Sequence, residues 1–272
     1  MITNDSAICQ SAAVRARQLM LEHPAAGRRQ IHWGSCFSCV EILSVLYHCV
    51  LRQGTAETQP DHFILSKGHA AFSLYTILYL KGLISASLYA SFREDGSSLS
   101  ELSHYDPALG IEVSGGSLGM GLSYGAGLAL LARKQHQSCR TYVLTGDGEL
   151  DEGNIWEAVM LISQLQLTDL TLIVDRNCLQ LDGDTEKILA WNEIGQRFAA
   201  FGFEVIFTDG HNCEELLSAF RQASLCGKPN VIVANTVKGK GVSFMEHQCV
   251  WHDKQLSAAE LQLARSEVNG DA

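Results

Sequence analysis

The chain has few of the features that divide a sequence into separate parts. It contains only 4 prolines among 272 residues, and no internal repeat, low-complexity segment or linker rich in proline and serine interrupts it. A chain of this length with 46% hydrophobic residues can bury a substantial core. Short apolar runs alternate with helical stretches, which favours one parallel-sheet unit. We therefore expect a single α/β domain over residues 1–272, with helices on both faces of a mostly parallel sheet.

Positive charge is scarce as well. Lysine and arginine number 20 against 30 acidic residues, which gives a net charge of −10, and no basic run exceeds two or three residues. This is the wrong sign for binding phosphate backbones or anionic lipid, so we expect neither nucleic acid nor a membrane surface as a partner. The N-terminus lacks the apolar core of a signal peptide, and we expect a cytoplasmic protein.

The cysteines lack the pairing that a structural zinc site needs. Nine are scattered along the chain, and the one close pair, Cys36 and Cys39, has no second pair to complete a metal site. Most of these cysteines are expected to be buried, reduced thiols. Charge is absent from residues 113–132, but this stretch holds six glycines and three serines. It therefore indicates a buried helix with a small face rather than a membrane span.

The most informative segment is the run Gly-Asp-Gly at residues 146–148, with Asn177 about thirty residues further on. Residues 141–145 are apolar and β-branched and predict a buried strand, residues 154–167 have helical spacing, and residues 170–175 predict the next strand. Asp147 and Asn177 would then lie at the carboxyl ends of two strands, the edge where open parallel sheets bind ligands.

Carboxylate and amide oxygens at this edge suit magnesium, which takes oxygen ligands and shares them with phosphate groups. Glycines and the following helix N-terminus would let backbone N–H groups approach the phosphates. The alternative is an ordinary Gly-Asp-Gly turn with an asparagine in an unrelated turn, since these residues are common in turns.

Several histidines lie on predicted turns, where a side chain can face a cleft. His69 opens an apolar helix over residues 70–80, and His32 precedes a helix expected to begin near Ser38, with Ser38 as N-cap and Glu41 completing a capping box. His104 lies in a loop before the glycine-rich stretch, and His252 follows a Lys-Gly-Lys-Gly loop. Each could equally be a solvent-facing loop histidine, as we expect for His23, His136 and His211.

The Gly-Asp-Gly motif with its distant asparagine resembles the thiamine diphosphate fingerprint, and further segments narrow the resemblance to the transketolase family, in particular to its short, split N-terminal subunits. These segments follow the order of the family and cover residues 32–252: 31–35 (Ile-His-Trp-Gly-Ser), 66–70 (Ser-Lys-Gly-His-Ala), 104–121 with Gly-Gly-Ser-Leu-Gly at 115–119, and 237–241 with Trp251-His252.

The resemblance implies thiamine diphosphate and Mg²⁺ as cofactors, and it implies a role for each matching residue. Asp147, Asn177 and the carbonyl of Leu179 would hold the metal. His32, His104 and His252 would surround the reacting carbons and move protons. The residues expected to bind the cofactor are His69, Gly116, Leu118, Gly146, Gly148, Asn177, Lys238 and His252. A solvent-exposed role for Lys238 and its neighbour Lys240 stays open.

The resemblance also implies that the chain is half of an enzyme. In this family a glutamate that activates the cofactor belongs to a second module, and only about twenty residues follow His252. We expect a C-terminal partner subunit to supply that glutamate, in an α2β2 assembly that transfers a two-carbon ketol unit between sugars or sugar phosphates. Glu152 and Glu157 are either a solvated helix face or part of the subunit contact.

Other functions remain alternatives at this point. The α half of a 2-oxoacid decarboxylase complex or a deoxyxylulose-phosphate synthase-like enzyme shares the magnesium motif, and an orphan binding subunit is the non-catalytic possibility. A nucleotide-binding dehydrogenase fits poorly, because no G-x-G-x-x-G follows the first strand. Ile31, Trp33 and Asp253 depart from the family pattern and could reshape the mouth of the site.

Overall fold

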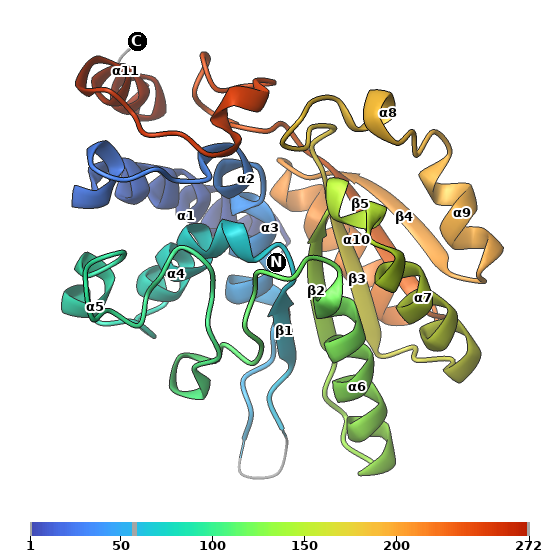
Figure 1. Cartoon of the computed structure of the whole chain (residues 1–272). Helices are drawn as coiled ribbons and strands as arrows, with labels where there is room; N and C mark the ends of the chain where they lie inside the picture. Colours follow the sequence, from blue (N-terminus) through green and yellow to red (C-terminus); the bar gives the residue numbers. More distant parts are fainter. Residues whose placement is uncertain (1, 56–58, 271–272) are drawn as a thin grey trace.

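A computed structural model of the chain describes residues 2–55 and 59–270 (Figure 1). Its centre is a 5-stranded sheet in the order β1-β2-β3-β5-β4, and every neighbouring pair is parallel. The strands are β1 (His62–Leu65), β2 (Thr141–Gly146), β3 (Leu170–Arg176), β4 (Glu204–Asp209) and β5 (Asn230–Asn235). The register pairs Gly146 with Asp175, so the segments after β2 and β3 leave the sheet side by side.

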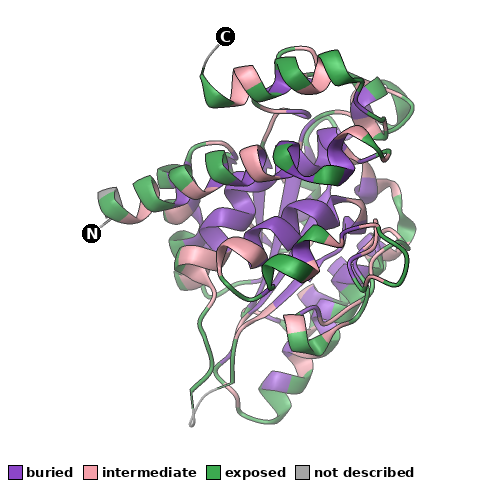
Figure 2. Cartoon of the chain, turned by 90° about the vertical axis from the view of Figure 1, so that its left-hand side faces the viewer, coloured by how far each residue is buried: buried purple, intermediate pink, exposed green. Residues whose placement is uncertain are grey.

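Helices cover both faces of the sheet, as the sequence predicts. Alternate strand residues point to opposite faces: Tyr142 and Leu144 join one hydrophobic cluster, and Val143 joins the other. Figure 2 shows the strands buried between helices whose outer sides are exposed. The helices are α1 (Ile2–Glu22), α2 (Trp33–Ser38), α3 (Val40–Val45), α4 (Ala71–Leu80), α5 (Ala86–Ala90), α6 (Met120–Lys134), α7 (Gly153–Leu165), α8 (Thr185–Ile188), α9 (Ile194–Ala200), α10 (Cys213–Leu225) and α11 (Ala258–Asn269).

The two faces are covered by different parts of the chain. Residues of α1, α3, α4 and α10 fill the first cluster, and residues of α6, α7 and α9 fill the second. A strand buried on both faces needs apolar side chains at every position, which is why β2 and β3 read as continuous apolar runs. The predicted strands at 141–145 and 170–175 and the predicted helices at 70–80 and 154–167 are confirmed to within two residues.

The glycine-rich stretch forms a loop followed by α6, and its small residues do permit close packing. A Cβ added at Gly125 would lie 2.5 Å from Cγ2 of Val143 on β2. The opposite face of α6 is more open than expected for a buried helix, because Tyr124 and Leu131 are exposed. Among the described residues no helix combines the length and apolarity needed to cross a membrane.

The predicted capping box at Ser38 and Glu41 is wrong. The helix begins earlier, at Trp33, and Ser38 is the last residue of α2 rather than the cap of α3. The Ser38 hydroxyl donates to Asp175 Oδ2 at 2.5 Å, and the Glu41 carboxylate accepts from Arg17 instead of closing a cap. Charged partners from distant segments outweigh the modest free energy of a local cap.

Two of the three histidines expected at the surface are in fact enclosed. His23 is only 5% exposed and accepts the Ala25 N–H at its Nδ1 atom, which caps a short 3-10 turn. His211 lies against the buried Glu41. His136 is exposed as expected. Cys36 and Cys39 are buried free thiols, which agrees with the prediction for most cysteines.

Candidate active site

A cavity of 270 Å³ opens at the carboxyl ends of β1, β2 and β3. The segments that follow these strands line it, together with the turn before α2, the glycine-rich loop and the segments that carry Lys238 and His252. The structure therefore brings nearly all of the predicted site residues to one place. Those that line the cavity are His32, His69, Gly116, Leu118, Gly146, Asp147, Gly148, Asn177, Leu179, Lys238 and His252. His104 is exposed on its loop and does not line the cavity.

Three oxygen-bearing groups meet at one wall of this cavity. Asp147 is 3% exposed, and its Oδ2 accepts the Cys178 N–H at 2.6 Å, which joins the end of β2 to the loop after β3. The Asn177 Oδ1 atom accepts the Leu179 N–H at 3.2 Å, and the Leu179 carbonyl faces the Lys238 ammonium at 3.0 Å. A carboxylate, an amide and a backbone carbonyl form an all-oxygen set, which suits a hard divalent cation such as Mg²⁺.

The charges at this wall favour a bound cation. Burial, with the nearby Asp175 carboxylate, raises the pKa of Asp147 to about 7. Burial, with the charge of Lys67, lowers the pKa of Lys238 to about 8. A divalent ion next to Asp147 would stabilise its ionised form, so the buried carboxylate fits the metal that the sequence predicts.

A buried ion pair lies behind the wall formed by Asp147, Asn177 and Leu179. Lys67 and Asp175 are 1% and 0% exposed and contact each other directly. Lys67 Nζ also donates to the Ser35 carbonyl at 3.1 Å, and Asp175 accepts from Thr236 as well as from Ser38. The pair fixes the turn after β1 against the end of β3. Sequence reasoning missed both residues, although a charged residue near the end of an apolar buried strand was a usable signal for Asp175.

Glu149 is a second buried group that the sequence analysis missed. It is 3% exposed, and its carboxylate accepts hydrogen bonds from the Ser66 hydroxyl, from the Gly119 N–H at 2.7 Å and from the Gly146 N–H at 3.1 Å. One side chain therefore joins the turn after β1, the glycine-rich loop and the end of β2.

Glycines let segments of the cavity wall pack closely against one another. A Cβ at Gly68 would lie 2.7 Å from Gly115 Cα, and one at Gly148 would lie 2.9 Å from Gln180 Cβ. Gly116 has a φ of 123°, a conformation that side chains with a Cβ rarely adopt. The Gly148 N–H, which the family resemblance assigns to the diphosphate, donates here to Asp147 Oδ1 at 2.9 Å.

Three imidazoles that also line the cavity cluster together. The ring centroids of His32, His69 and His252 are 5.4 Å apart in every pair. Burial lowers the pKa of each ring, most clearly that of His69, and the charge of Lys238 helps to lower the pKa of His252 to about 3. At neutral pH these rings are uncharged, so they can both donate and accept hydrogen bonds. Lys238 Nζ lies 2.9 Å from His252 Nδ1, which makes Nδ1 the acceptor.

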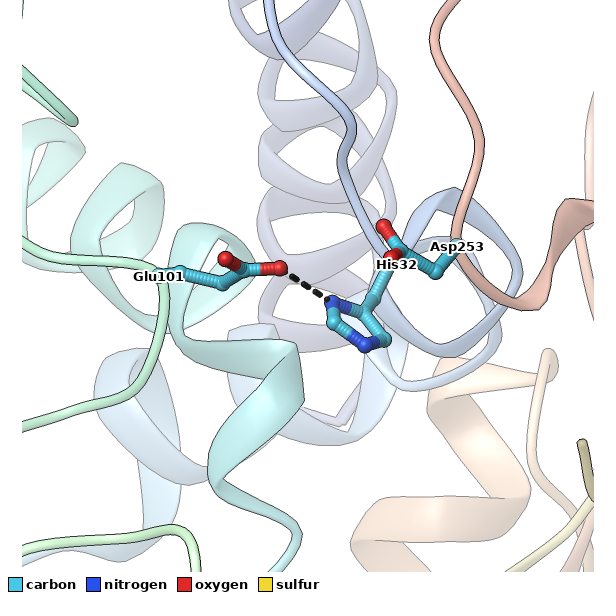
Figure 3. Close-up of side chains that lie close together, drawn as sticks. All are labelled: His32, Glu101 and Asp253. Carbon is cyan, nitrogen blue, oxygen red and sulfur yellow. Dashed lines mark ion pairs between the residues drawn. The ribbon is translucent and has the colours of Figure 1, made fainter.

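Carboxylates flank His32 at the cavity mouth (Figure 3). Glu101 Oε1 lies 3.1 Å from His32 Nδ1, and Glu101 Oε2 lies 3.1 Å from the Arg93 guanidinium. A carboxylate oxygen of Asp253 completes a group whose atoms lie within 4.8 Å of one another. The Arg93 contact already neutralises much of the Glu101 charge, which disfavours a second cation here. No motif in the sequence pointed to Glu101.

The departures from the family pattern lie in different environments. Asp253 is exposed and has a carboxylate oxygen close to His32, which lines the cavity. Trp33 is 0% exposed and packs against Phe37 and Phe72, so it belongs to the core and not to the cavity lining. Ile31 is also buried, and its backbone pairs with Lys254.

Comparison with known proteins gives consistent matches along the chain. The sequence model described as "Transketolase, thiamine diphosphate binding domain" matches residues 10–271. One of the subunits of apulose-4-phosphate transketolase from Phocaeicola vulgatus is 39% identical over 242 residues, which cover 88% of this chain and 86% of the relative. One of the subunits of 6-deoxy-6-sulfo-D-fructose transketolase from a Clostridium species is 36% identical over 241 residues, with 87% and 88% covered.

Longer relatives match over only part of their length. Human transketolase is 38% identical over 231 residues, which cover 83% of this chain but 36% of the human protein. The crystal structure of transketolase from Campylobacter jejuni superimposes with a TM-score of 0.87 at 30% identity and covers 96% of this chain. Because the match covers 43% of the Campylobacter chain, the present chain spans less than half of that enzyme's length.

Proposed function

The chain belongs to the transketolase family, and from that premise we propose that it is the diphosphate-binding subunit of a two-subunit transketolase. In this function it binds thiamine diphosphate and Mg²⁺, and together with a C-terminal partner subunit it moves a two-carbon ketol unit from a ketose or ketose phosphate to an aldose. The observation that carries this proposal is that Asp147, Asn177 and Leu179 line one cavity together with three clustered histidines.

Each wall would have its own task. Asp147, Asn177 and Leu179 would hold the magnesium ion, and Lys238 would move from the Leu179 carbonyl toward the diphosphate. Thiamine diphosphate, when bound, would supply the nucleophilic carbon that ketol transfer needs. Gly68 and Gly115 let the turn after β1 and the glycine-rich loop pack backbone against backbone at the edge of the cavity.

The histidines would form hydrogen bonds with the sugar and transfer protons to and from its oxygens. His32, His69 and His252 are uncharged at neutral pH because burial lowers their pKa, so they can exchange hydrogen bonds with hydroxyl and carbonyl oxygens at low cost. Lys238 donates a hydrogen bond to Nδ1 of His252, so the proton of the uncharged His252 ring lies on Nε2, which is free to donate. His104 would join these residues only if its loop moves toward the cavity when the partner or the sugar binds.

A partner subunit fits the outer surface of α6 and α7. These two helices pack together on one face of the sheet (Figure 1), and their outward sides expose large apolar residues next to Glu152 and Glu157. An exposed apolar patch of this kind is typical of an interaction surface. The partner would contribute the activating glutamate, with two copies of each subunit in the assembly. The apolar residues are Met120, Tyr124, Leu131, Met160 and Leu161.

Reconstitution tests this function directly. The chain is purified alone and with its C-terminal partner, thiamine diphosphate and Mg²⁺ are added, and ketol transfer is followed over a panel of donors. The panel includes ordinary pentulose phosphates, apulose 4-phosphate and 6-deoxy-6-sulfofructose, because the related subunits are named for the last two sugars. We expect activity only in the pair. Transfer by the isolated chain would contradict the half-enzyme assignment, and inactivity of the pair with every donor would favour a non-catalytic subunit.

The metal assignment has its own test. Asp147→Asn keeps the shape of the side chain and removes its charge, so magnesium-dependent binding of thiamine diphosphate to the reconstituted pair should weaken by about 100-fold or more. Asp182→Asn, an exposed change in a neighbouring loop, is the matched control and should bind normally. Isothermal titration calorimetry with and without Mg²⁺ measures both. Equal affinities for the two variants would remove Asp147 from the metal site.

A further inference from the structure

Two thiols lie in contact far from the cofactor cavity. Cys9 on α1 and Cys49 in the π-helical turn Leu46–Val50 have their Sγ atoms 3.4 Å apart. Cys9 is 0% exposed, whereas Cys49 is exposed. A disulfide bond is about 2.05 Å long, so the two sulfurs need to approach by roughly 1.4 Å, which small side-chain rotations can supply. Cys49 can therefore react with a reagent in solution, whereas the buried Cys9 can react only after Cys49 has done so.

The exposed thiol also lines a second cavity, of 290 Å³, whose wall carries three arginines. Arg52 is paired with Asp61 at 2.7 Å, and the Arg140 guanidinium donates to the Ser224 carbonyl at 2.9 Å. Within residues 2–55 and 59–270, neither Arg140 nor Arg221 has an ion-pair partner. The cavity is therefore cationic, in a chain whose net charge is −10.

The second cavity and the cofactor cavity lie at opposite ends of the sheet. Arg140 and Tyr142, at the start of β2, line the cationic cavity, whereas Gly146 and Asp147, at the end of the same strand, line the cofactor cavity. A small molecule in the cationic cavity would leave the cofactor cavity free, so this site is independent of the proposed ketol transfer.

We propose that Cys49 and Cys9 form a thiol–disulfide exchange site that reacts with small anionic disulfides, of which oxidised glutathione is the test case. The arginines attract and hold the carboxylates of the reagent, which places its disulfide next to the Cys49 sulfur. Cys9 then resolves the mixed disulfide. The product is a reversible covalent bond between α1 and the turn that follows α3.

The chemistry proceeds in two exchange steps. The Cys49 thiolate attacks one sulfur of the reagent, a new S–S bond forms, the original S–S bond breaks, and the departing thiolate takes a proton from water. Cys9 then releases its proton to solvent, its sulfur attacks Cys49 Sγ, and the second small thiol leaves. Two protein thiols are oxidised by two electrons in total, and one small disulfide is reduced to two thiols.

The environment of the two sulfurs fixes the order of the steps. Burial, reinforced by the contact with Cys49, raises the pKa of the Cys9 thiol, so Cys9 stays protonated and is a poor first nucleophile. Cys49 is the accessible sulfur of the pair and lines the cavity that carries the arginines, so a reagent held there reaches Cys49 first. Once Cys49 carries the mixed disulfide, its sulfur no longer repels the negative charge that develops on Cys9.

Peptide mapping of the whole chain tests this site. The purified, reduced chain is treated with oxidised glutathione, quenched with an alkylating agent and digested for mass spectrometry. In the wild type we expect a Cys9–Cys49 disulfide with no retained glutathione. Cys9→Ala should trap one glutathionyl group on Cys49, and Cys49→Ser, a change at an exposed position, should lose both products. Cys226→Ser, a change at a half-exposed cysteine outside the cavity lining, is the matched control and should behave as the wild type.

Charge and stability provide independent measurements. At low ionic strength oxidised glutathione should react roughly fivefold faster than cystamine, a cationic disulfide, and high salt should remove most of that difference. The internal disulfide closes a long loop, so the oxidised chain should melt about 5 °C or more above the reduced chain, and dithiothreitol should reverse the shift.

Several results would overturn this inference. One is glutathione reacting with Cys178 or Cys226 before Cys49. Another is a wild-type chain that retains as much mixed disulfide as Cys9→Ala does. Cystamine reacting as fast as glutathione at low salt would exclude the role of the arginines, and an unchanged melting temperature after complete oxidation would exclude a disulfide that links α1 to the π-helical turn.

Discussion

Replacing Glu41 with glutamine tests the buried network that joins four distant segments of the chain. Glu41 is 2% exposed, and its two carboxylate oxygens accept from the Arg17 guanidinium at 2.5 and 2.8 Å. Its Oε2 atom also lies 3.0 Å from His211 Nδ1, and His211 Nε2 accepts the Val237 N–H at 2.8 Å. The network therefore ties α1 and α3 to the loop that carries Lys238.

The size of the effect follows from the pKa of this carboxyl. Burial alone would raise it, but the charge of Arg17 and hydrogen bonds from His211 and Arg17 outweigh burial and lower the pKa of Glu41 from 4.5 to about 2. Each pKa unit corresponds to 1.36 kcal/mol, so ionised Glu41 contributes about 3 kcal/mol to the free energy of unfolding. Because the folded-state pKa is the lower one, this contribution is complete above pH 4.5 and is lost as the pH falls from 4.5 toward 2.

Urea unfolding followed by circular dichroism measures this contribution. At pH 7, Glu41→Gln should lower the free energy of unfolding by about 3 kcal/mol, and the difference from wild type should shrink by about 1.4 kcal/mol for each pH unit below 4.5. Glu22→Gln is the matched control, because the Arg15–Glu22 pair has side chains 46% and 51% exposed and should contribute less than about 0.5 kcal/mol. A Glu41 effect as small as the control, or one that does not change on acidification, would refute the reasoning.

Three further predictions concern other buried or packed positions. Lys67→Met leaves its carboxylate partner buried and unpaired, so thermal unfolding should show a loss of about 3–5 kcal/mol, and a loss below about 1 kcal/mol would contradict this. Glu101→Gln removes a charge that raises the pKa of His32, so NMR titration should show the His32 pKa moving further below its ordinary value, not upward. Gly125→Ala would crowd β2 and should destabilise the chain by about 1–3 kcal/mol, whereas Gly127→Ala, which meets nothing within 4 Å, should be neutral or stabilising in the same unfolding assay.

The sheet was predictable because its signal is local. Residues of β2 and β3 are buried on both faces, and this requirement leaves largely apolar runs, the first of which ends at Gly146 and the second at Asp175. The position of the proposed metal site follows from the same signal, since Asp147 directly follows β2 and Asn177 directly follows β3. Once neighbouring strands are parallel, their ends must meet at one edge.

The buried groups behind Asp147 and Asn177 could not be predicted from the sequence in the same way. Lys67 and Asp175 are 108 positions apart, and Ser66 and Glu149 are 83 apart, so nothing in the sequence near one member identifies the other. Ser38 and Glu41 have capping-box spacing, but each finds a charged partner from another segment, and those contacts replace the cap. The sequence around His23 and His211 does not indicate that they are enclosed, because His23 contacts Tyr89 and His211 contacts Glu41, both far away in the chain.

The Glu149 carboxylate has a consequence for how the cavity moves. Its acceptor atoms are shared by Ser66 in the turn after β1, Gly119 in the glycine-rich loop and Gly146 at the end of β2. None of these segments can move away without leaving a buried carboxylate short of a donor, so the amide protons of Gly119 and Gly146 should exchange with solvent through one common opening event. The three segments of the cavity floor therefore open together, and a ligand that steadies any one of them slows the opening of the others.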